Sequence, residues 1–233
     1  VMSYPRQALF RPGMVSLVRS RCAVFRRALL LKTFAYLTCA SHADELTFQA
    51  DFLRYHSRAI TDECSVEGVV RAYTASKKHQ LNIELIVGSM FWLNQECQVV
   101  LLCPNREAYA ELCRIITNAR RRSEKGSYQL SEWDLMSAKH CLILWLPSHT
   151  SSDHKWGNWL AQHHQHRLWL GIQRHLKSDD KQYLEHCEQL AQDLQLQHSA
   201  RGGVLMPTAH PLPLHTTMTA IPPGRQSTGI GAK

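Results

Sequence analysis

The chain has 233 residues, of which 44% are hydrophobic and 20% are charged. These proportions are typical of one ordinary globular domain that can bury a core. No stretch of about 18 apolar residues runs without a charge, which excludes a membrane-spanning helix. The eight cysteines are too sparse for a disulfide scaffold, and none belongs to a CxxC pair, which argues against a structural zinc site.

The net charge of +8 is concentrated at the two ends of the chain. Residues 1–43 hold seven Arg and Lys and no acid, and residues 199–233 hold three Arg and Lys and no acid. Residues 44–198 hold 17 basic and 19 acidic residues, a net charge of −2. A pI near 9.2 would by itself suggest a nucleic acid or an anionic surface as partner. Here the basic charge indicates only two basic ends.

Short apolar runs alternate with amphipathic stretches along the body of the chain. The spacing of apolar residues predicts helices that follow Ser41 and that cover residues 66–79, 105–121, 156–164 and 183–194. Apolar runs predict strands over residues 58–62, 83–93, 98–103, 141–146 and 168–172. This alternation favours an α/β fold with parallel strands joined by crossovers. No Gly-rich loop follows any predicted strand, so neither a Rossmann fingerprint nor a P-loop is present.

The composition divides the chain into three regions. Residues 1–28 form a basic extension, which is either poorly structured or a targeting peptide, since transit peptides are rich in Arg and poor in acids. Residues 29–206 form the predicted domain. Residues 207–233 form a tail that contains five of the nine prolines and resists regular structure.

One stretch carries a specific resemblance to a known family. Residues 59–72, AITDECSVEGVVRA, resemble the PHP (polymerase and histidinol phosphatase) region that opens bacterial error-prone DNA polymerases of the C family. Other segments also resemble this family and come in the family's order along the chain, at residues 38–42, 85–88, 118–128 and 202–221. The resemblance implies an α/β fold that is a distorted (β/α)7 barrel similar to a TIM barrel, incomplete at both ends. In such barrels the chemistry lies at the carboxyl ends of the strands.

The resemblance also implies a metal site, and the sequence departs from it. Catalytic PHP proteins hold several metal ions with His, Asp and Glu side chains, and these ions activate water against a phosphate ester. The first motif, His-x-His, falls on residues 28–34, which contain no histidine. Glu63 stands where catalytic members carry His, and Met90 stands where the family carries Glu. The last motif, Asp-x-His-x-His, falls on residues 203–207 without any of its ligands. Asp62 is the only ligand candidate that remains.

These departures predict that the chain alone has no catalytic residue, no bound metal and no cofactor, although intact family members use divalent metal. The resemblance implies the N-terminal PHP part of an error-prone DNA polymerase, truncated or degenerate, without the carboxylates of the palm. The intact protein would act in the cytoplasm, in DNA replication and damage-induced repair synthesis. Its implied partners are DNA and the rest of the polymerase chain, with no membrane. The alternatives are a stand-alone module that binds nucleic acid or protein, and a phosphoesterase, against which the missing ligands argue.

A basic cluster in the body has two interpretations. Arg120, Arg121, Arg122 and Lys125 lie at the end of the predicted helix over residues 105–121. They can contact a phosphate backbone, because Arg clusters neutralise phosphates with little sequence readout. They can also form a solvated helix end, where cations complement the helix dipole.

Two further groups invite a chemical interpretation and a structural one. His163, His164 and His166 suggest a metal site, but no nearby Cys or carboxylate completes a ligand set, so a polar helix end is favoured. Cys64 follows Asp62 and suggests a nucleophile, but the sequence places no general base near it. A buried packing cysteine is therefore favoured.

Overall fold

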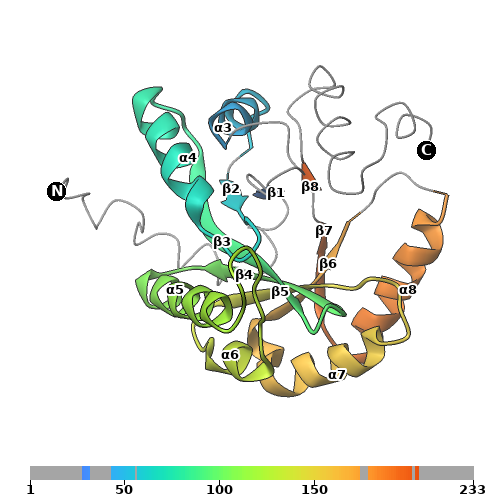
Figure 1. Ribbon diagram of the computed structural model, residues 1–233. Helices are drawn as coiled ribbons and strands as arrows, with labels where there is room; N and C mark the ends of the chain where they lie inside the picture. Colours follow the sequence, from blue (N-terminus) through green and yellow to red (C-terminus); the bar gives the residue numbers. More distant parts are fainter. Residues whose placement is uncertain (1–27, 32–42, 56, 174–177, 201–202, 205–233) are drawn as a thin grey trace, which may run out of the picture.

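The computed structural model describes residues 28–31, 43–55, 57–173, 178–200 and 203–204 (Figure 1). The strands are β1 (Ala28–Leu31), β2 (Ser57–Ile60), β3 (Glu84–Leu93), β4 (Cys97–Cys103), β5 (Leu142–Leu146), β6 (Leu168–Ile172), β7 (Gln197–Ala200) and β8 (Gly203–Val204). The helices are α3 (Ala43–Phe52), α4 (Glu67–Lys78), α5 (Arg106–Arg121), α6 (Glu132–Ser137), α7 (Asp153–His164) and α8 (Asp180–Asp193), with a 3-10 turn η1 (Gln165–Arg167) after α7.

The strands form one mixed sheet in the order β7-β6-β5-β4-β3-β2-β1-β8. Neighbouring strands are parallel, except that β4 runs antiparallel to both β3 and β5. The prediction of parallel strands is therefore wrong at β4. Residues 94–96 alone connect β3 to β4, whereas a parallel crossover needs about a dozen residues or more.

The sheet curls into an incomplete α/β barrel, as the sequence predicts. β7 and β8 lie at opposite ends of the strand order, yet two residues of sequence separate them. The Cα atoms of Ala200 and Gly203 can therefore be at most about 11 Å apart, since three trans peptide units span no more. The ends of the sheet must approach each other, although no strand pairing joins β7 to β8 within the described residues.

The two faces of the sheet carry different cores. The face under the helices holds the larger one, in which Phe91, Leu101 and Trp145 of the sheet pack with Leu112 of α5 and Leu160 of α7. Figure 1 shows α5, α6, α7 and α8 on this outer side. The inner face holds a separate apolar cluster made only of strand residues. Its buried members are Ala59, Ile86, Met90, Val100, Leu102, Leu144 and Leu146.

The predicted elements agree with the structure except at polar helix starts and short segments. α4 and α5 lie within one residue of their predicted bounds. α7 and α8 each begin three residues before their predicted start, at Asp153 and Asp180, because acidic first-turn residues add nothing to an apolar pattern. The short elements β1, α6, β7 and β8 were not predicted. Ser41, residues 1–27 of the predicted extension and the whole 207–233 tail lie outside the described residues. None of the described helices combines the length and the apolar character that crossing a bilayer requires.

Gly88 of β3 is a site where the sheet leaves no room for a side chain. A Cβ at this position would lie 2.7 Å from the carbonyl oxygen of Leu101 and 2.8 Å from Cδ2 of Leu102. We expect Gly88→Ala to lower the free energy of unfolding, measured in urea, by about 1–3 kcal/mol, because the backbone oxygen cannot move without disturbing the strand pairing. Gly171→Ala is the control, since its Cβ would contact only leucine side chains, which can shift. An equal or larger loss for Gly171→Ala would contradict this account.

Candidate functional site

Asp62, the ligand candidate from the sequence, lies just after β2 and is 1% exposed. Its Oδ2 accepts a hydrogen bond from the backbone N–H of Gly68 (3.0 Å), one of the open N–H groups in the first turn of α4. Its carbonyl oxygen accepts hydrogen bonds from Oγ of Ser89 (2.8 Å) and from the N–H of Met90 (3.0 Å). Asp62 therefore joins the end of β2 to both β3 and α4.

Glu63 and Cys64 are held from the other side by Arg120, in the last turn of α5, and by Tyr128, which follows that helix. The hydroxyl of Tyr128 donates to Oε1 of Glu63 (2.8 Å) and accepts from the backbone N–H of Trp92 (2.9 Å). The guanidinium of Arg120 donates to the carbonyl oxygens of Cys64 (3.3 Å) and Glu63 (3.4 Å). It also lies 5.6 Å from the centre of the Tyr128 ring. We call Arg120 and Tyr128 the loop clamp.

Cys64 behaves as a packing residue at this site. Its side chain is buried, and its backbone has a positive φ of 45°. Burial raises the pKa of its thiol to about 11, against a smaller opposing effect of Arg120. The thiol is therefore protonated at neutral pH, and a protonated thiol is a poor nucleophile.

The residues at this edge of the barrel do not fit the metal cluster that the family resemblance implies. Asp62 and Glu63 both accept hydrogen bonds from the protein itself. Met90, at the family's Glu position, is 0% exposed within the apolar inner face, and its Sδ lies 2.8 Å from Nε2 of Gln98. Over the described ranges, no three His, Cys, Asp or Glu side chains are grouped so that they could hold a metal ion. Hard cations need charged or carbonyl oxygen ligands, which the apolar side chains around Met90 do not supply.

The basic cluster at the end of α5 is divided between internal contacts and solvent. Arg120 belongs to the loop clamp. Arg122 binds the carboxylate of Asp134 through both of its terminal nitrogens, with Nη2 2.9 Å from Oδ1. Burial acts to raise the pKa of Asp134, but hydrogen bonds from Arg122 and Ser131 lower it below its usual range. Arg121 and Lys125 are exposed.

Sequence reasoning missed a polar group at the carboxyl ends of β5 and β6. Asp153, at the start of α7, is 2% exposed and accepts hydrogen bonds from the N–H groups of Ser148 (3.2 Å) and Thr150 (3.1 Å). Nε2 of His186, from α8, lies 3.0 Å from its Oδ2. The His149 ring lies 4.9 Å from that of His186, and His149 has a positive φ of 60°. The contact between Asp153 and His186 joins α7 to α8. Only the fold brings residues so distant in sequence together.

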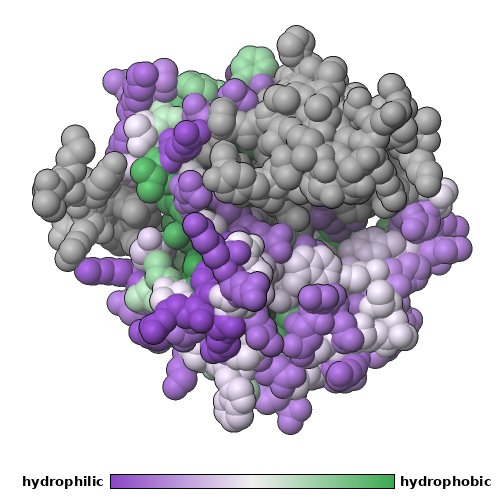
Figure 2. Space-filling view, viewed as in Figure 1, coloured by the Kyte–Doolittle hydropathy of each residue, from purple (hydrophilic) through white to green (hydrophobic). Residues whose placement is uncertain are grey.

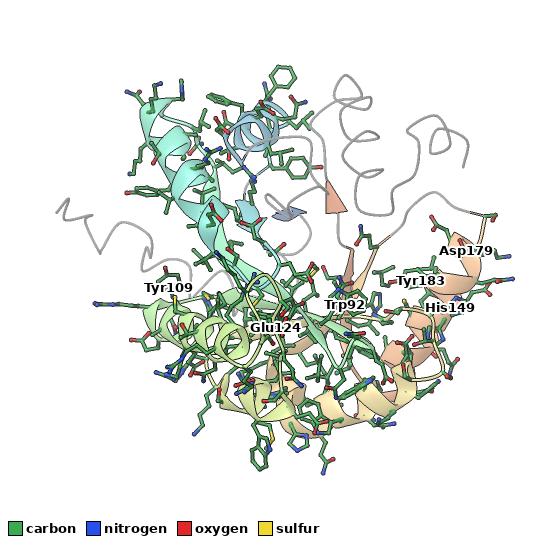
Figure 3. The ribbon with its side chains drawn as sticks, viewed as in Figure 1. Trp92, Tyr109, Glu124, His149, Asp179 and Tyr183 are labelled. Carbon is green, nitrogen blue, oxygen red and sulfur yellow. The ribbon has the colours of Figure 1, made fainter. Side chains whose placement is uncertain are left out.

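A polar cavity of about 220 Å³ adjoins this group. Its lining includes Ser148, Gln173, Asp179 and Tyr183. Figure 3 shows Asp179 and Tyr183 near His149, between the loop after β5 and α8. Amide, hydroxyl and carboxylate groups can bind a small polar molecule there, but they do not supply the ligand set of a metal cluster.

The three histidines near the end of α7 lie in different environments. His164 is 1% exposed, and its Nδ1 lies 3.2 Å from Nη2 of Arg167. Burial, with Arg167 nearby, lowers the pKa of His164 to about 4, so the ring is neutral at neutral pH. Nδ1 of His163 lies 2.8 Å from the carbonyl oxygen of Trp159, and His166 is exposed. His166 fits the prediction of a polar helix end with surface histidines, but His164 does not, because its ring is buried.

Tyr128→Phe tests the loop clamp. The substitution removes the donor to Glu63 and leaves the backbone N–H of Trp92 without its acceptor. We expect the free energy of unfolding to fall by about 1–3 kcal/mol, measured in urea, because a part-buried N–H would lose its partner. Tyr73→Phe on α4 is the matched control and should change it by less than about 0.5 kcal/mol. Equal effects of the two substitutions would exclude a structural role for the Tyr128 hydroxyl.

His164 makes a specific contribution to acid sensitivity. Its pKa is about 4 in the folded chain and 6.5 in the reference state, so between these values the unfolded state binds the additional proton. Stability should therefore fall as the pH drops through this window. We expect the wild type to lose about 2–3 kcal/mol more of its free energy of unfolding than His164→Gln between about pH 7 and pH 4. His166→Gln, at an exposed position, should follow the wild type. Parallel losses in the wild type and His164→Gln would show that His164 does not titrate in this way.

Comparison with known proteins agrees with the resemblance found in the sequence. The PHP domain family model matches residues 31–148. The chain is 67% identical over 191 residues to an error-prone DNA polymerase of Vibrio parahaemolyticus, covering 82% of this chain and 19% of that protein. It is 40% identical over 196 residues to an error-prone DNA polymerase of Idiomarina loihiensis, covering 83% of this chain and 19% of that protein. The chain thus spans about one fifth of the length of these curated relatives.

Solved structures share the fold at low sequence identity. A candidate metal-dependent phosphoesterase from Bifidobacterium adolescentis matches with a TM-score of 0.51 and 12% identity, covering 75% of this chain and 86% of the other. An amidohydrolase from Chromobacterium violaceum matches with a TM-score of 0.53 and 12% identity, covering 77% and 87%. These similarities concern the barrel and not its chemistry. Because the family model spans just over half of the sequence and the barrel has the expected form, the chain belongs to the PHP domain family.

Proposed function

We propose that this chain is the PHP module of an error-prone DNA polymerase, and that it acts in the polymerase as a structural and docking module without phosphoesterase activity. The identity to the Vibrio parahaemolyticus and Idiomarina loihiensis polymerases supports the assignment to this kind of protein. The observation that supports the structural role is the set of contacts made by the loop after β2. Asp62 and Glu63 in this loop accept hydrogen bonds from the chain itself, and Met90 of the neighbouring strand β3 occupies a third position at which the family resemblance implies a ligand.

The chemistry of these three positions supports this role. A metal-dependent phosphoesterase needs ligand groups that fix an ion and leave a position open for water. Here the carboxylate of Asp62 is part of the start of α4, and that of Glu63 is bound to the loop clamp. The thioether of Met90 is a poor ligand for the hard cations that bind phosphate oxygens. The same residues that weaken metal binding stabilise the edge of the barrel.

The setting of the module follows from the proposed assignment. The partners would be the rest of the polymerase chain and, through it, DNA, and the protein would work in the cytoplasm in replication and damage-induced repair synthesis. The polymerase reaction itself needs carboxylates that hold paired metal ions at the primer end. We assign that reaction to the part of the relatives that lies outside the span matched by this chain.

Metal content and phosphate ester hydrolysis test the proposal together. The purified chain is incubated with Mn²⁺ or Zn²⁺, desalted, analysed for metal, and assayed with p-nitrophenyl phosphate. We expect substoichiometric metal and no hydrolysis above the protein-free rate. Asp62→Asn should leave both measurements unchanged and keep most of the stability, because its amide oxygen can still accept from Gly68. Asp62→Ala should cost about 1 kcal/mol through the lost hydrogen bond from the backbone N–H of Gly68.

The contrary outcome is equally specific. Stoichiometric Mn²⁺ or Zn²⁺ that is lost in Asp62→Asn, with hydrolysis lost in parallel, would replace the structural role by that of a metal-dependent phosphoesterase.

A further inference from the structure

The charge of the domain is unevenly distributed. Residues 114–139 hold six basic and three acidic residues, a net charge of +3. Because residues 44–198 as a whole have a net charge of −2, the rest of that span carries −5. Figure 2 shows strongly hydrophilic residues at the lower left, over the region where α5 ends and α6 begins. The positive charge is thus localised at this junction.

Three cations at this junction are available to a ligand. Arg114 and Arg121 lie seven residues apart on α5, so they share a face and are separated by about 10 Å along the helix axis. Lys125 follows in the turn after the helix. All three are exposed, and none of their side chains makes a hydrogen bond or an ion pair with any part of the chain that the structure describes. Arg120 and Arg122, in contrast, have internal partners.

An exposed aromatic ring lies at the start of the adjoining helix. Trp133 of α6 is 78% exposed, and Met136, one turn further on, is 37% exposed. Asp134, the residue after Trp133, is held by Arg122. It also forms a capping box with Ser131, in which the side chain of each residue accepts a hydrogen bond from the backbone N–H of the other. The start of α6 is therefore held against the end of α5. An indole that extends from a rigid helix start presents its face to solvent with little loss of conformational freedom.

We propose that the α5–α6 junction binds single-stranded DNA, with Arg114, Arg121 and Lys125 contacting phosphates and Trp133 stacking on a base. Exposed cations at the end of α5 and an exposed aromatic ring at the start of the adjoining helix α6 supply the two components of sequence-tolerant single-strand binding. The exposed acids Glu124 and Glu132 offset part of the charge, so the affinity is modest and strongly dependent on salt. The choice of DNA rests on the proposed function, whereas the location of the surface rests on the charges and on Trp133.

Fluorescence anisotropy of a labelled oligo(dT) of about 20 nucleotides tests the proposal with the full chain. The variant Arg114→Gln/Arg121→Gln/Lys125→Gln is compared with the control Lys78→Gln/Lys155→Gln/Lys181→Gln, which removes the same charge from exposed sites on α4, α7 and α8. The basic chain ends are unchanged in both variants. We expect the slope of log affinity against log salt to fall by about 2 in the junction variant, at about 0.7 per lost phosphate contact, and to change little in the control.

Trp133 is tested separately. Trp133→Ala should weaken binding by about tenfold, and Trp133→Phe should retain most of it, because every base can stack on an aromatic face. No binding by the wild type, or equal slopes in the two triple variants, would overturn the proposal. An unchanged affinity in Trp133→Ala would overturn the stacking contact and would indicate a purely electrostatic surface. Neither result bears on metal content or hydrolysis, so failure here is distinct from failure of the proposed function.

Discussion

At the carboxyl end of β2 the chain leaves the sheet, and hydrogen bonds within the protein hold the loop that follows. The carboxylate of Asp62 caps α4, and its carbonyl oxygen accepts two hydrogen bonds from β3. Arg120 and Tyr128 hold the next two residues from the opposite side. A buried carboxylate is costly unless it is hydrogen-bonded. The arrangement of β2, β3, α4 and α5 therefore depends on these contacts being made together.

The inner face of the barrel is likewise stabilised by contacts within the protein. Where strands converge, side chains must either fill the space or bind something that does. Here Met90 and its neighbours fill it with apolar groups, while hydrogen bonds within the protein satisfy the polar groups at the rim. The scaffold is thus stabilised by burial in positions where a catalytic relative would hold ions.

Much of the fold could be predicted from the sequence, and the failures have physical causes. Regular apolar spacing places α4 and α5 correctly, since their buried residues recur with the helical period. The buried face of α5 nevertheless includes Glu111, which no apolar pattern can reveal. Its carboxylate accepts a hydrogen bond from the backbone N–H of His140, and its Oε1 lies 2.7 Å from Nδ1 of that residue. The antiparallel β4 was predicted as a strand, but its direction follows from the length of its connection and not from its composition.

The candidate site was only partly predictable for a related reason. The family resemblance identifies Asp62 as a ligand candidate, and it predicts that the family's other ligand positions hold residues that do not bind metal. The basic run at the end of α5 gives no sign that Arg120 and Arg122 point to internal partners while Arg121 does not. Those partners, Cys64 and Asp134, lie 56 and 12 residues away in sequence and meet these side chains only through the fold.

The pairing of β1 with β8 affects how the barrel assembles. Leu30 and Gly203 are partners in this pairing although about 170 residues of chain lie between them. Closing so long a loop has a large entropic cost before any contact compensates for it, and proteins dominated by distant contacts fold slowly. We therefore expect the β1–β8 seam to form late, after the hairpin of β3 and β4 and the helices that pack on it. Until then, β1 pairs with β2 alone and its other edge is available for pairing with another chain, so newly made protein is most prone to association during that interval.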